Sequence, residues 1–219
     1  MQIAIFLYDK FTALDAIGPY EVLSRLPNTT VVFVAEQSGP VRTDNGMLSL
    51  VAEARIGQVQ SPDIVVVPGG PGQATAPQMT DGPVHDWLRT ADERASWTTS
   101  VCTGSLILAA AGLLTGRRAT SHWLALERLR ELGATPVSKR VVMDGKYISA
   151  AGVSAGIDMA LDLAGRIAGR QTAEAIQLMI EYDPHPPYSA GSPDTAPADL
   201  VARLRLRSRH LSASAQAAD

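Results

Sequence analysis

Three short runs in this sequence are apolar at nearly every position rather than at every second one. They are IAIFLY at 3–8, VVFVA at 31–35 and DIVVVP at 63–68. A strand that is apolar throughout is buried on both faces, which is typical of a parallel sheet covered by helices. The runs therefore predict an α/β fold with a mainly parallel central sheet.

Helical and hairpin patterns alternate with these runs. Gly18-Pro19 interrupts the chain after the first run and predicts a helix from Pro19 to about Leu26, with Asp15 in the loop before it. We expect further helices at 82–94, 103–112, 122–132, 155–169 and 172–182, and hairpins at 39–50 and 141–149.

The length and the final segment predict the domain organisation. A chain of 219 residues suits one large α/β domain, which we place at 1–183. The segment 184–219 is a Pro/Gly-rich tail with a basic stretch at 200–211 that is expected to form a helix packed on the same domain.

Charge and hydropathy exclude several classes of partner. The formal net charge of -3 argues against nucleic acid, and no apolar run approaches the roughly 20 residues that span a bilayer. The N-terminus resembles no secretory signal, so we expect a cytoplasmic protein without membrane association. The single cysteine rules out an internal disulfide and disfavours structural zinc.

That cysteine, Cys102, lies where a predicted strand at 97–101 meets an apolar helix. The small residues after it, Thr103, Gly104 and Ser105, permit a tight turn that resembles a nucleophile elbow. Amides at the start of the helix are expected to lower the thiol pKa below its usual 8.5 or so. The alternative is a buried, inert cysteine.

Other candidate residues follow neighbouring strands. Asp15 reaches the same edge of the sheet and could exchange a proton with Cys102, or it could cap a helix. The amides of Gly69 and Gly70 could join the Thr103 amide in a hole for negative charge, or could belong to an ordinary turn. His122 is a possible base beside the cysteine.

Together, LDAIGPYEVL, VVPGGPG and SVCTGSLILAAAGLL resemble the ThiJ/PfpI superfamily over roughly residues 1–180. The resemblance implies a flavodoxin-like three-layer sandwich. Within the superfamily, VCTGSL, RATSHW, AGVSAGID and the tail EYDPHPPYSAGSPDTAP are most similar to the isocyanide hydratases.

The resemblance implies hydration of an isocyanide to an N-substituted formamide by a homodimer, without a metal or organic cofactor. Its catalytic residues match Cys102, Asp15 and Thr103. Substrate contacts are implied at five positions: Gly70, Gly18, Val153, Trp123 and Asp183.

Two other activities of relatives stay as alternatives. A glyoxalase-like enzyme or a redox-responsive protective protein would use the same reactive cysteine, although such relatives tend to carry Glu where this chain has Asp15. A Cys-His peptidase is disfavoured because protease-like relatives have histidine where this chain has Thr103.

Overall fold

A seven-stranded sheet forms the centre of the computed structural model, which describes residues 1–206 and Ser208. The strand order is β10-β11-β7-β6-β1-β2-β5, and every pairing is parallel except that of β10 with β11. The bounds are β1 Gln2–Phe6, β2 Thr30–Ala35, β5 Ala54–Arg55, β6 Ile64–Val67, β7 Trp97–Val101, β10 Val141–Asp144 and β11 Tyr147–Ala150.

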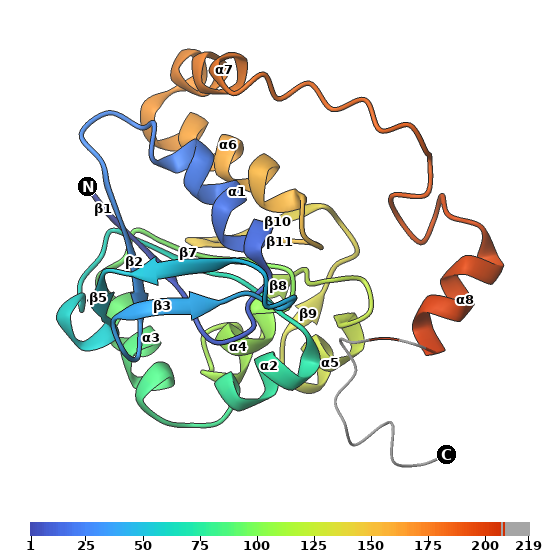
Figure 1. Ribbon diagram of the computed structural model, residues 1–219, viewed down its shortest axis with the longest axis horizontal. Coiled ribbons are helices and arrows are strands. Elements are labelled where there is room, and N and C mark those ends of the chain that lie inside the picture. The colour runs from blue at the N-terminus through green and yellow to red at the C-terminus, as the bar shows by residue number, and fades with distance from the viewer. Residues whose placement is uncertain (207, 209–219) are drawn as a thin grey trace.

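Helices cover both faces of this sheet, and Figure 1 shows α1, α6 and α7 above it and α2, α3, α4 and α5 below it. Their bounds are α1 Ala13–Leu23, α2 Gly72–Gln78, α3 Pro83–Arg94, α4 Gly104–Ala110, α5 Leu126–Glu131, α6 Ala155–Ala168 and α7 Arg170–Met179. The predicted three-layer α/β sandwich is confirmed.

Two small two-stranded sheets, β3-β4 and β8-β9, are separate from the seven-stranded sheet. Both predicted hairpins are present, one as β10–β11 and the other as a separate pair of strands. The bounds of these strands are β3 Gly39–Arg42, β4 Ser49–Ala52, β8 Arg118–Ala119 and β9 Thr135–Pro136, and a 3-10 helix spans Ile56–Gln58.

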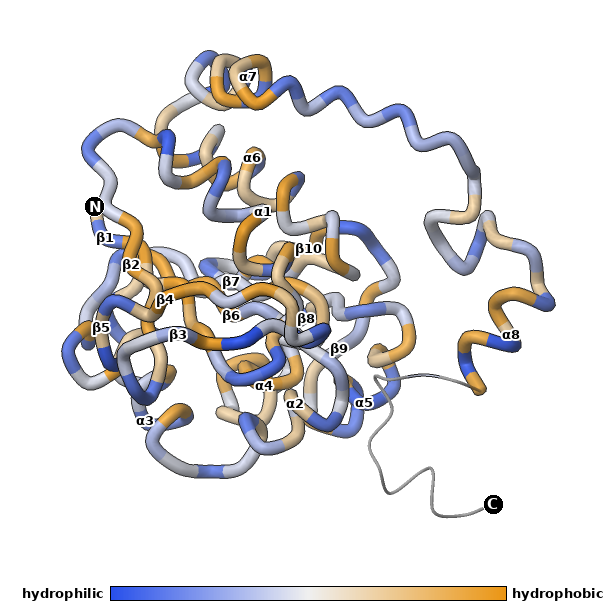
Figure 2. The backbone as a smooth tube through the Cα atoms, in the orientation of Figure 1, coloured by the Kyte–Doolittle hydropathy of each residue, from blue (hydrophilic) through white to orange (hydrophobic). Residues whose placement is uncertain are grey.

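The fully apolar runs form the buried centre of the sheet. All four residues of β6 and residues 3–6 of β1 have no exposed surface. Figure 2 shows the apolar residues concentrated along these strands and the segment after α7 mostly polar. Burial on both faces explains why these strands lack the alternating pattern of a half-exposed sheet.

The first helix differs from its prediction. It begins at Ala13, so Asp15 lies in its first turn and Pro19 lies inside it. Pro19 cannot donate a hydrogen bond to the Asp15 carbonyl, which usually ends a helix. Here the proline ring packs closely on Gly156 of α6, and this contact between the two helices offsets the missing bond.

Two other helices differ from the prediction: α2 was not predicted, and α5 is shorter than predicted. The short helix α2 was not expected, since residues 72–78 follow directly on the glycine-rich turn. Helix α5 covers only part of the predicted 122–132, because residues 122–125 form a turn that the backbone bond from Ala125 to His122 closes.

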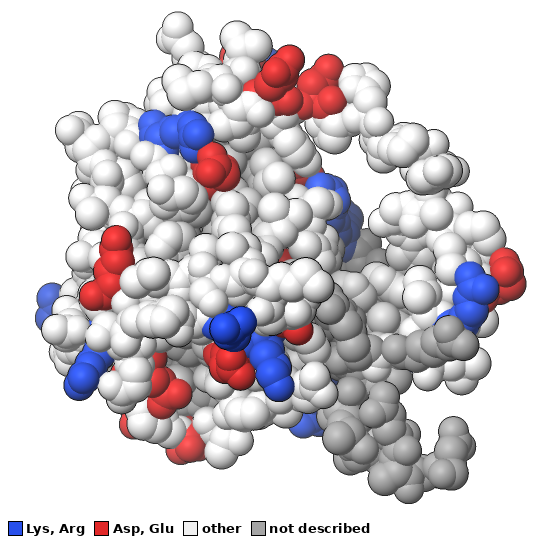
Figure 3. Space-filling model, viewed as in Figure 1, with Lys and Arg blue, Asp and Glu red and all other residues white. Residues whose placement is uncertain are grey.

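The segment after α7 arches away from the rest of the molecule before it returns (Figures 1 and 3). It ends in α8 Ala198–Leu206, which buries none of its residues and places the Arg205 guanidinium 5.8 Å from the Trp123 ring centre. Helix α8 overlaps the predicted helix at 200–211 but begins two residues earlier, and residues 207 and 209–211 of that prediction fall outside the described part. None of the described helices is long and apolar enough to cross a bilayer.

Candidate active site

Four segments of the chain meet at the carboxyl edge of the parallel sheet. Cys102 follows β7, Gly69 follows β6, the loop 151–154 follows β11, and Asp15 lies in the helix after β1. Open α/β sheets place their sites at this edge, because the loops that leave adjacent strands converge there. The topology thus brings together residues that lie far apart in the sequence.

Cys102 occupies a strained turn between β7 and α4. Its φ is +57°, a left-handed conformation that costs a side-chain-bearing residue about 1–2 kcal/mol. Its amide donates hydrogen bonds to the carbonyls of Ala150 and Ala151, at 3.0 and 3.1 Å. The Ser105 and Ser121 hydroxyls donate to its carbonyl at 3.1 and 3.0 Å. These bonds hold the elbow that the sequence predicted.

Two glycines allow the turn to approach its neighbours. A Cβ on Gly104 would lie 2.0 Å from the Val67 carbonyl oxygen, so α4 can begin against β6 only with glycine at this position. A Cβ on Gly69 would lie 2.5 Å from the Thr103 amide nitrogen and 3.0 Å from Asp15 Oδ2. Both positions therefore require glycine because a side chain would collide with neighbouring backbone, and not because the chain must be flexible there.

The Cys102 thiol faces a carboxylate and two backbone amides. It is hydrogen bonded to the Asp15 side chain, and the amides of Thr103 and Val153 donate to its sulfur. Asp15 Oδ2 also accepts a hydrogen bond from the Gly69 amide at 2.9 Å. Cys102, Asp15 and Thr103 have no exposed surface, so this arrangement is closed to bulk water.

This environment overturns the expectation of a lowered thiol pKa. Burial raises the pKa of Cys102 well above its ordinary value, and the negative charge of Asp15 raises it further. The Thr103 and Val153 amides lower the thiol pKa, but by less. These influences together favour the neutral thiol over the free thiolate at Cys102.

Neither glycine amide after β6 is available for an oxyanion in this structure. The Gly70 amide donates to Thr103 Oγ1 at 2.9 Å, and the Gly69 amide is engaged with Asp15. The amide that accompanies Thr103 at the sulfur comes instead from Val153, in the loop after β11. The sequence did not predict that this loop reaches Cys102, because the loop lies about 50 residues later and comes close only since β11 pairs with β7 in the sheet.

Thr75 is a buried neighbour of the site that the sequence did not indicate. Its hydroxyl lies 3.1 Å from the Gly70 and Pro71 carbonyls and 3.2 Å from Thr103 Oγ1. The Tyr8 phenol is hydrogen bonded to the same threonine and has a raised pKa, mainly because it is fully buried. These groups anchor the turn after β6 against the elbow.

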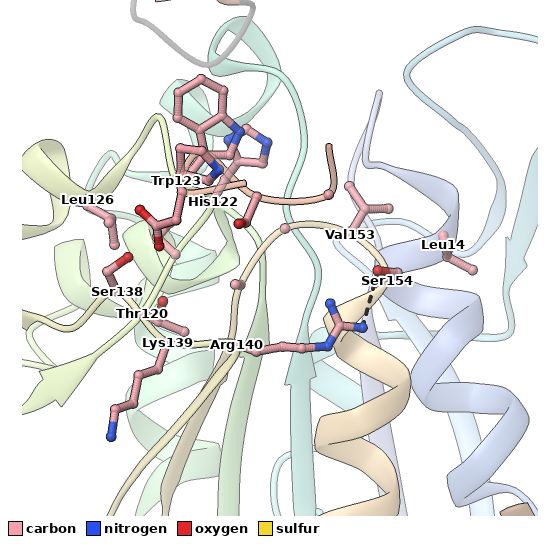
Figure 4. Close-up of a pocket in the computed structure, with 17 residues that line it drawn as sticks. Leu14, Thr120, His122, Trp123, Leu126, Ser138, Lys139, Arg140, Val153 and Ser154 are labelled. Carbon is pink, nitrogen blue, oxygen red and sulfur yellow. Dashed lines mark hydrogen bonds between the residues drawn. The ribbon is translucent and has the colours of Figure 1, made fainter. Parts of the chain in front are cut away.

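A pocket of about 470 Å³ lies beside the loop 151–154, whose Val153 amide donates to the Cys102 sulfur (Figure 4). Cys102 is not among the residues that line it. Trp123 and His122 lie on one side of it, and Val153 and Leu14 lie across from them. The residues that line it are Leu14, Thr120, Ser121, His122, Trp123, Leu126, Ser138, Lys139, Arg140, Ala151, Gly152, Val153, Ser154, Gly191, Ser192, Pro193 and Asp194.

The predicted substrate-contact residues divide between this pocket and other places. Trp123 and Val153 line the pocket. Gly18 lies in the contact of α1 with α6, where an added Cβ would be 3.1 Å from Ile157. Asp183 is exposed in the segment after α7, and Gly70 lies behind the elbow.

His122 also lines the pocket, where its ring packs on Gly152, and its Nδ1 accepts a hydrogen bond from the Leu124 amide. It is not among the main influences on the thiol pKa, which are burial, Asp15 and two amides. Within the described residues, no group of three or more histidine, cysteine, aspartate or glutamate side chains is placed to hold a metal ion.

The chain is similar to known proteins over most of its length. Residues 1–166 match the model of the DJ-1/PfpI family. An isonitrile hydratase of Pseudomonas putida is 44% identical over 207 residues, which cover 94% of this chain and 90% of that protein.

Solved structures agree with the sequence comparison. A ThiJ/PfpI family protein from Pseudomonas syringae superposes with a TM-score of 0.90 at 40% identity, covering 94% of this chain and 85% of that one. Drosophila melanogaster DJ-1beta has a TM-score of 0.74 at 21% identity, covering 84% and 98%, a likeness of fold alone.

Proposed function

Because this chain belongs to the DJ-1/PfpI family, we propose that it hydrates isocyanides to N-substituted formamides, with Cys102 as nucleophile and Asp15 as acid and base. One observation carries the proposal: a buried thiol hydrogen bonded to a buried carboxylate, with two amides directed at the sulfur. The identity of 44% to an isonitrile hydratase indicates which electrophile this pair attacks.

The first step forms a bond between sulfur and carbon. Asp15 takes the thiol proton while the Cys102 sulfur attacks the terminal carbon of the isocyanide. The same proton then passes from Asp15 to that carbon, which leaves a thioimidate, Cys–S–CH=N–R, and an ionised carboxylate. A high thiol pKa is compatible with this step, because the proton leaves only when the substrate is in place.

The second step adds water and releases the product. Asp15 accepts a proton from water as the water oxygen attacks the thioimidate carbon, and Asp15 then passes that proton to the nitrogen. Asp15 next takes the proton of the new hydroxyl as the tetrahedral adduct collapses and the C–S bond breaks. It returns this proton to the sulfur, and the formamide leaves. The Thr103 and Val153 amides stabilise the sulfur while it carries negative charge.

The substituent on the isocyanide nitrogen would occupy the pocket beside the loop 151–154. Leu14, which precedes Asp15, and Val153, whose amide donates to the sulfur, both line that pocket. A substrate that passes between these two side chains would present its carbon to Cys102. Trp123 would then contact the substituent.

We propose a homodimer in the cytoplasm as the working form. Leu178 and Met179 of α7 are 80% and 71% exposed, and such apolar side chains would be covered in a symmetric pair. Light scattering after size exclusion tests this assembly, and a monomer at micromolar concentration would contradict it.

The decisive experiment mixes the protein with cyclohexyl isocyanide and follows formamide formation by NMR. We expect many turnovers per protein molecule, and none for Cys102→Ala that retains the wild-type circular dichroism spectrum. Trapping of a species whose mass equals protein plus isocyanide would support the thioimidate. Turnover by the Cys102→Ala variant would exclude cysteine catalysis.

A further inference from the structure

We propose that the pocket beside the loop 151–154 selects isocyanides whose substituent carries a carbonyl or carboxylate oxygen, and that Arg140 binds this oxygen. The inference rests on the proposed function and names its substrate class. The pocket volume of about 470 Å³ lies in the range of ligand pockets, about 300–1,000 Å³, and exceeds what the isocyano group alone requires.

Several polar groups that line the pocket can donate a hydrogen bond to a ligand. The Trp123 indole and the hydroxyls of Thr120 and Ser138 have no hydrogen-bond partner among the residues that the structure describes. An indole N–H can only donate, and a hydroxyl can donate to whatever acceptor is offered. A ligand rich in acceptor oxygens therefore suits this lining better than a hydrocarbon does.

Arg140 supplies the strongest donor and is held in place from behind. Its Nε bonds to Asp158, and its Nη2 donates to Ser154 Oγ at 3.3 Å and to the Tyr182 hydroxyl at 3.5 Å. Tyr182 in turn donates to Asp158 Oδ1 at 2.6 Å. A guanidinium that is already oriented loses little conformational freedom when it binds a ligand.

One nitrogen of that guanidinium stays available. Arg140 Nη1 makes no hydrogen bond within residues 1–206, and the side chain is half exposed at the pocket wall. Figure 4 shows Arg140 extending across the pocket floor toward Ser154, while Lys139 points away. Arg140 is therefore the cation best placed to meet a ligand oxygen.

The surrounding charges decide which oxygens are accepted. Asp158 offsets part of the guanidinium charge, and Asp194 contributes a negative charge to the wall formed by the segment after α7. Arg205, over the Trp123 ring, adds a positive charge near the rim. With Lys139, which also lines the pocket, three cations face two carboxylates, so the pocket is weakly positive and suits both a neutral ester carbonyl and a carboxylate.

The test compares two isocyanides of equal chain length, ethyl isocyanoacetate and pentyl isocyanide. We expect the wild-type kcat/KM to favour the ester at least tenfold, since a hydrogen bond to a charged donor is usually worth that factor. Because the ester also differs in intrinsic reactivity, the decisive quantity is the change in this ratio. Arg140→Gln should reduce the ratio about tenfold, and the matched control Arg128→Gln, on exposed α5, should leave it unchanged.

A second measurement separates this inference from the proposed function. Binding of the formamide products, N-formylglycine ethyl ester and N-pentylformamide, is measured by NMR titration with wild-type protein and Arg140→Lys, which keeps the charge but not the planar fork. Preferential binding of the ester that weakens in the variant supports the pocket assignment even if no isocyanide is turned over. Equal binding, or a preference that survives both substitutions, would overturn it.

Discussion

The Gly69 amide donates a hydrogen bond to Asp15 Oδ2 at 2.9 Å, and this bond joins the turn after β6 to the helix after β1. The same carboxylate is hydrogen bonded to the Cys102 thiol, which directly follows the neighbouring strand β7. The segments after β1, β6 and β7 therefore fix the position of the Asp15 carboxylate relative to the Cys102 thiol proton. The consequences of this arrangement can be measured.

A side chain at position 69 should collide with Thr103 and displace the turn after β6. In Gly69→Ala the new Cβ would lie 2.5 Å from the Thr103 amide nitrogen, so the turn must shift and the bond to Asp15 must lengthen. We expect the free energy of unfolding in urea to fall by about 1–3 kcal/mol, together with loss of turnover. Gly57→Ala is the matched control, because an added Cβ there meets nothing within 4 Å.

Removal of the Asp15 charge should lower both the activity and the thiol pKa. Since the carboxylate charge raises the pKa of Cys102, Asp15→Asn should shift the pH midpoint of iodoacetamide alkylation downward. Turnover should decrease by about 10²–10⁴-fold, because the proton acceptor is gone. Asp162→Asn, on the exposed face of α6, is the control, and an unchanged alkylation midpoint in Asp15→Asn would contradict the assigned geometry.

The hydroxyl of Thr103 should contribute more to stability and turnover than the shape of its side chain. Thr103 Oγ1 accepts from the Gly70 amide at 2.9 Å and donates to the Gly70 carbonyl at 2.8 Å. Thr103→Val leaves both groups buried without this partner, which should cost about 1–3 kcal/mol of stability. Thr103→Ser should restore most of the stability and the turnover. If valine and serine behave alike in urea unfolding, these bonds contribute little.

Stability should fall at high pH through Tyr147. Burial and the hydrogen bond from its hydroxyl to Asp92 Oδ2, 2.9 Å long, raise the pKa of Tyr147 to about 12. The unfolded chain releases this proton near pH 10, so the stabilisation is complete below that pH and is lost as the pH rises to about 12. Tyr147→Phe should show a smaller loss of unfolding free energy between pH 9.5 and 12 in urea titrations. A loss as large as that of the wild type would contradict the assignment.

The sequence by itself determined the parallel sheet and the place of the candidate nucleophile, Cys102. Residues buried on both faces must be apolar at every position, so β1 and β6 are visible as continuous apolar runs. Cys102 is visible because a strand, a tight turn and a helix follow one another locally, and the small residues after it are needed for that turn. These are signals between near neighbours in the chain.

Only the tertiary structure decided the environment of Cys102. The thiol pKa is raised rather than lowered because segments far apart in the sequence bury Cys102. A local sequence pattern does not indicate how deeply a residue is buried. Pro19 can lie inside α1 because α6 packs against it, and the Val153 amide reaches the sulfur because β11 lies beside β7. Contacts between strands that neighbour one another in the sheet but not in the sequence set the charge, the donors and the pocket.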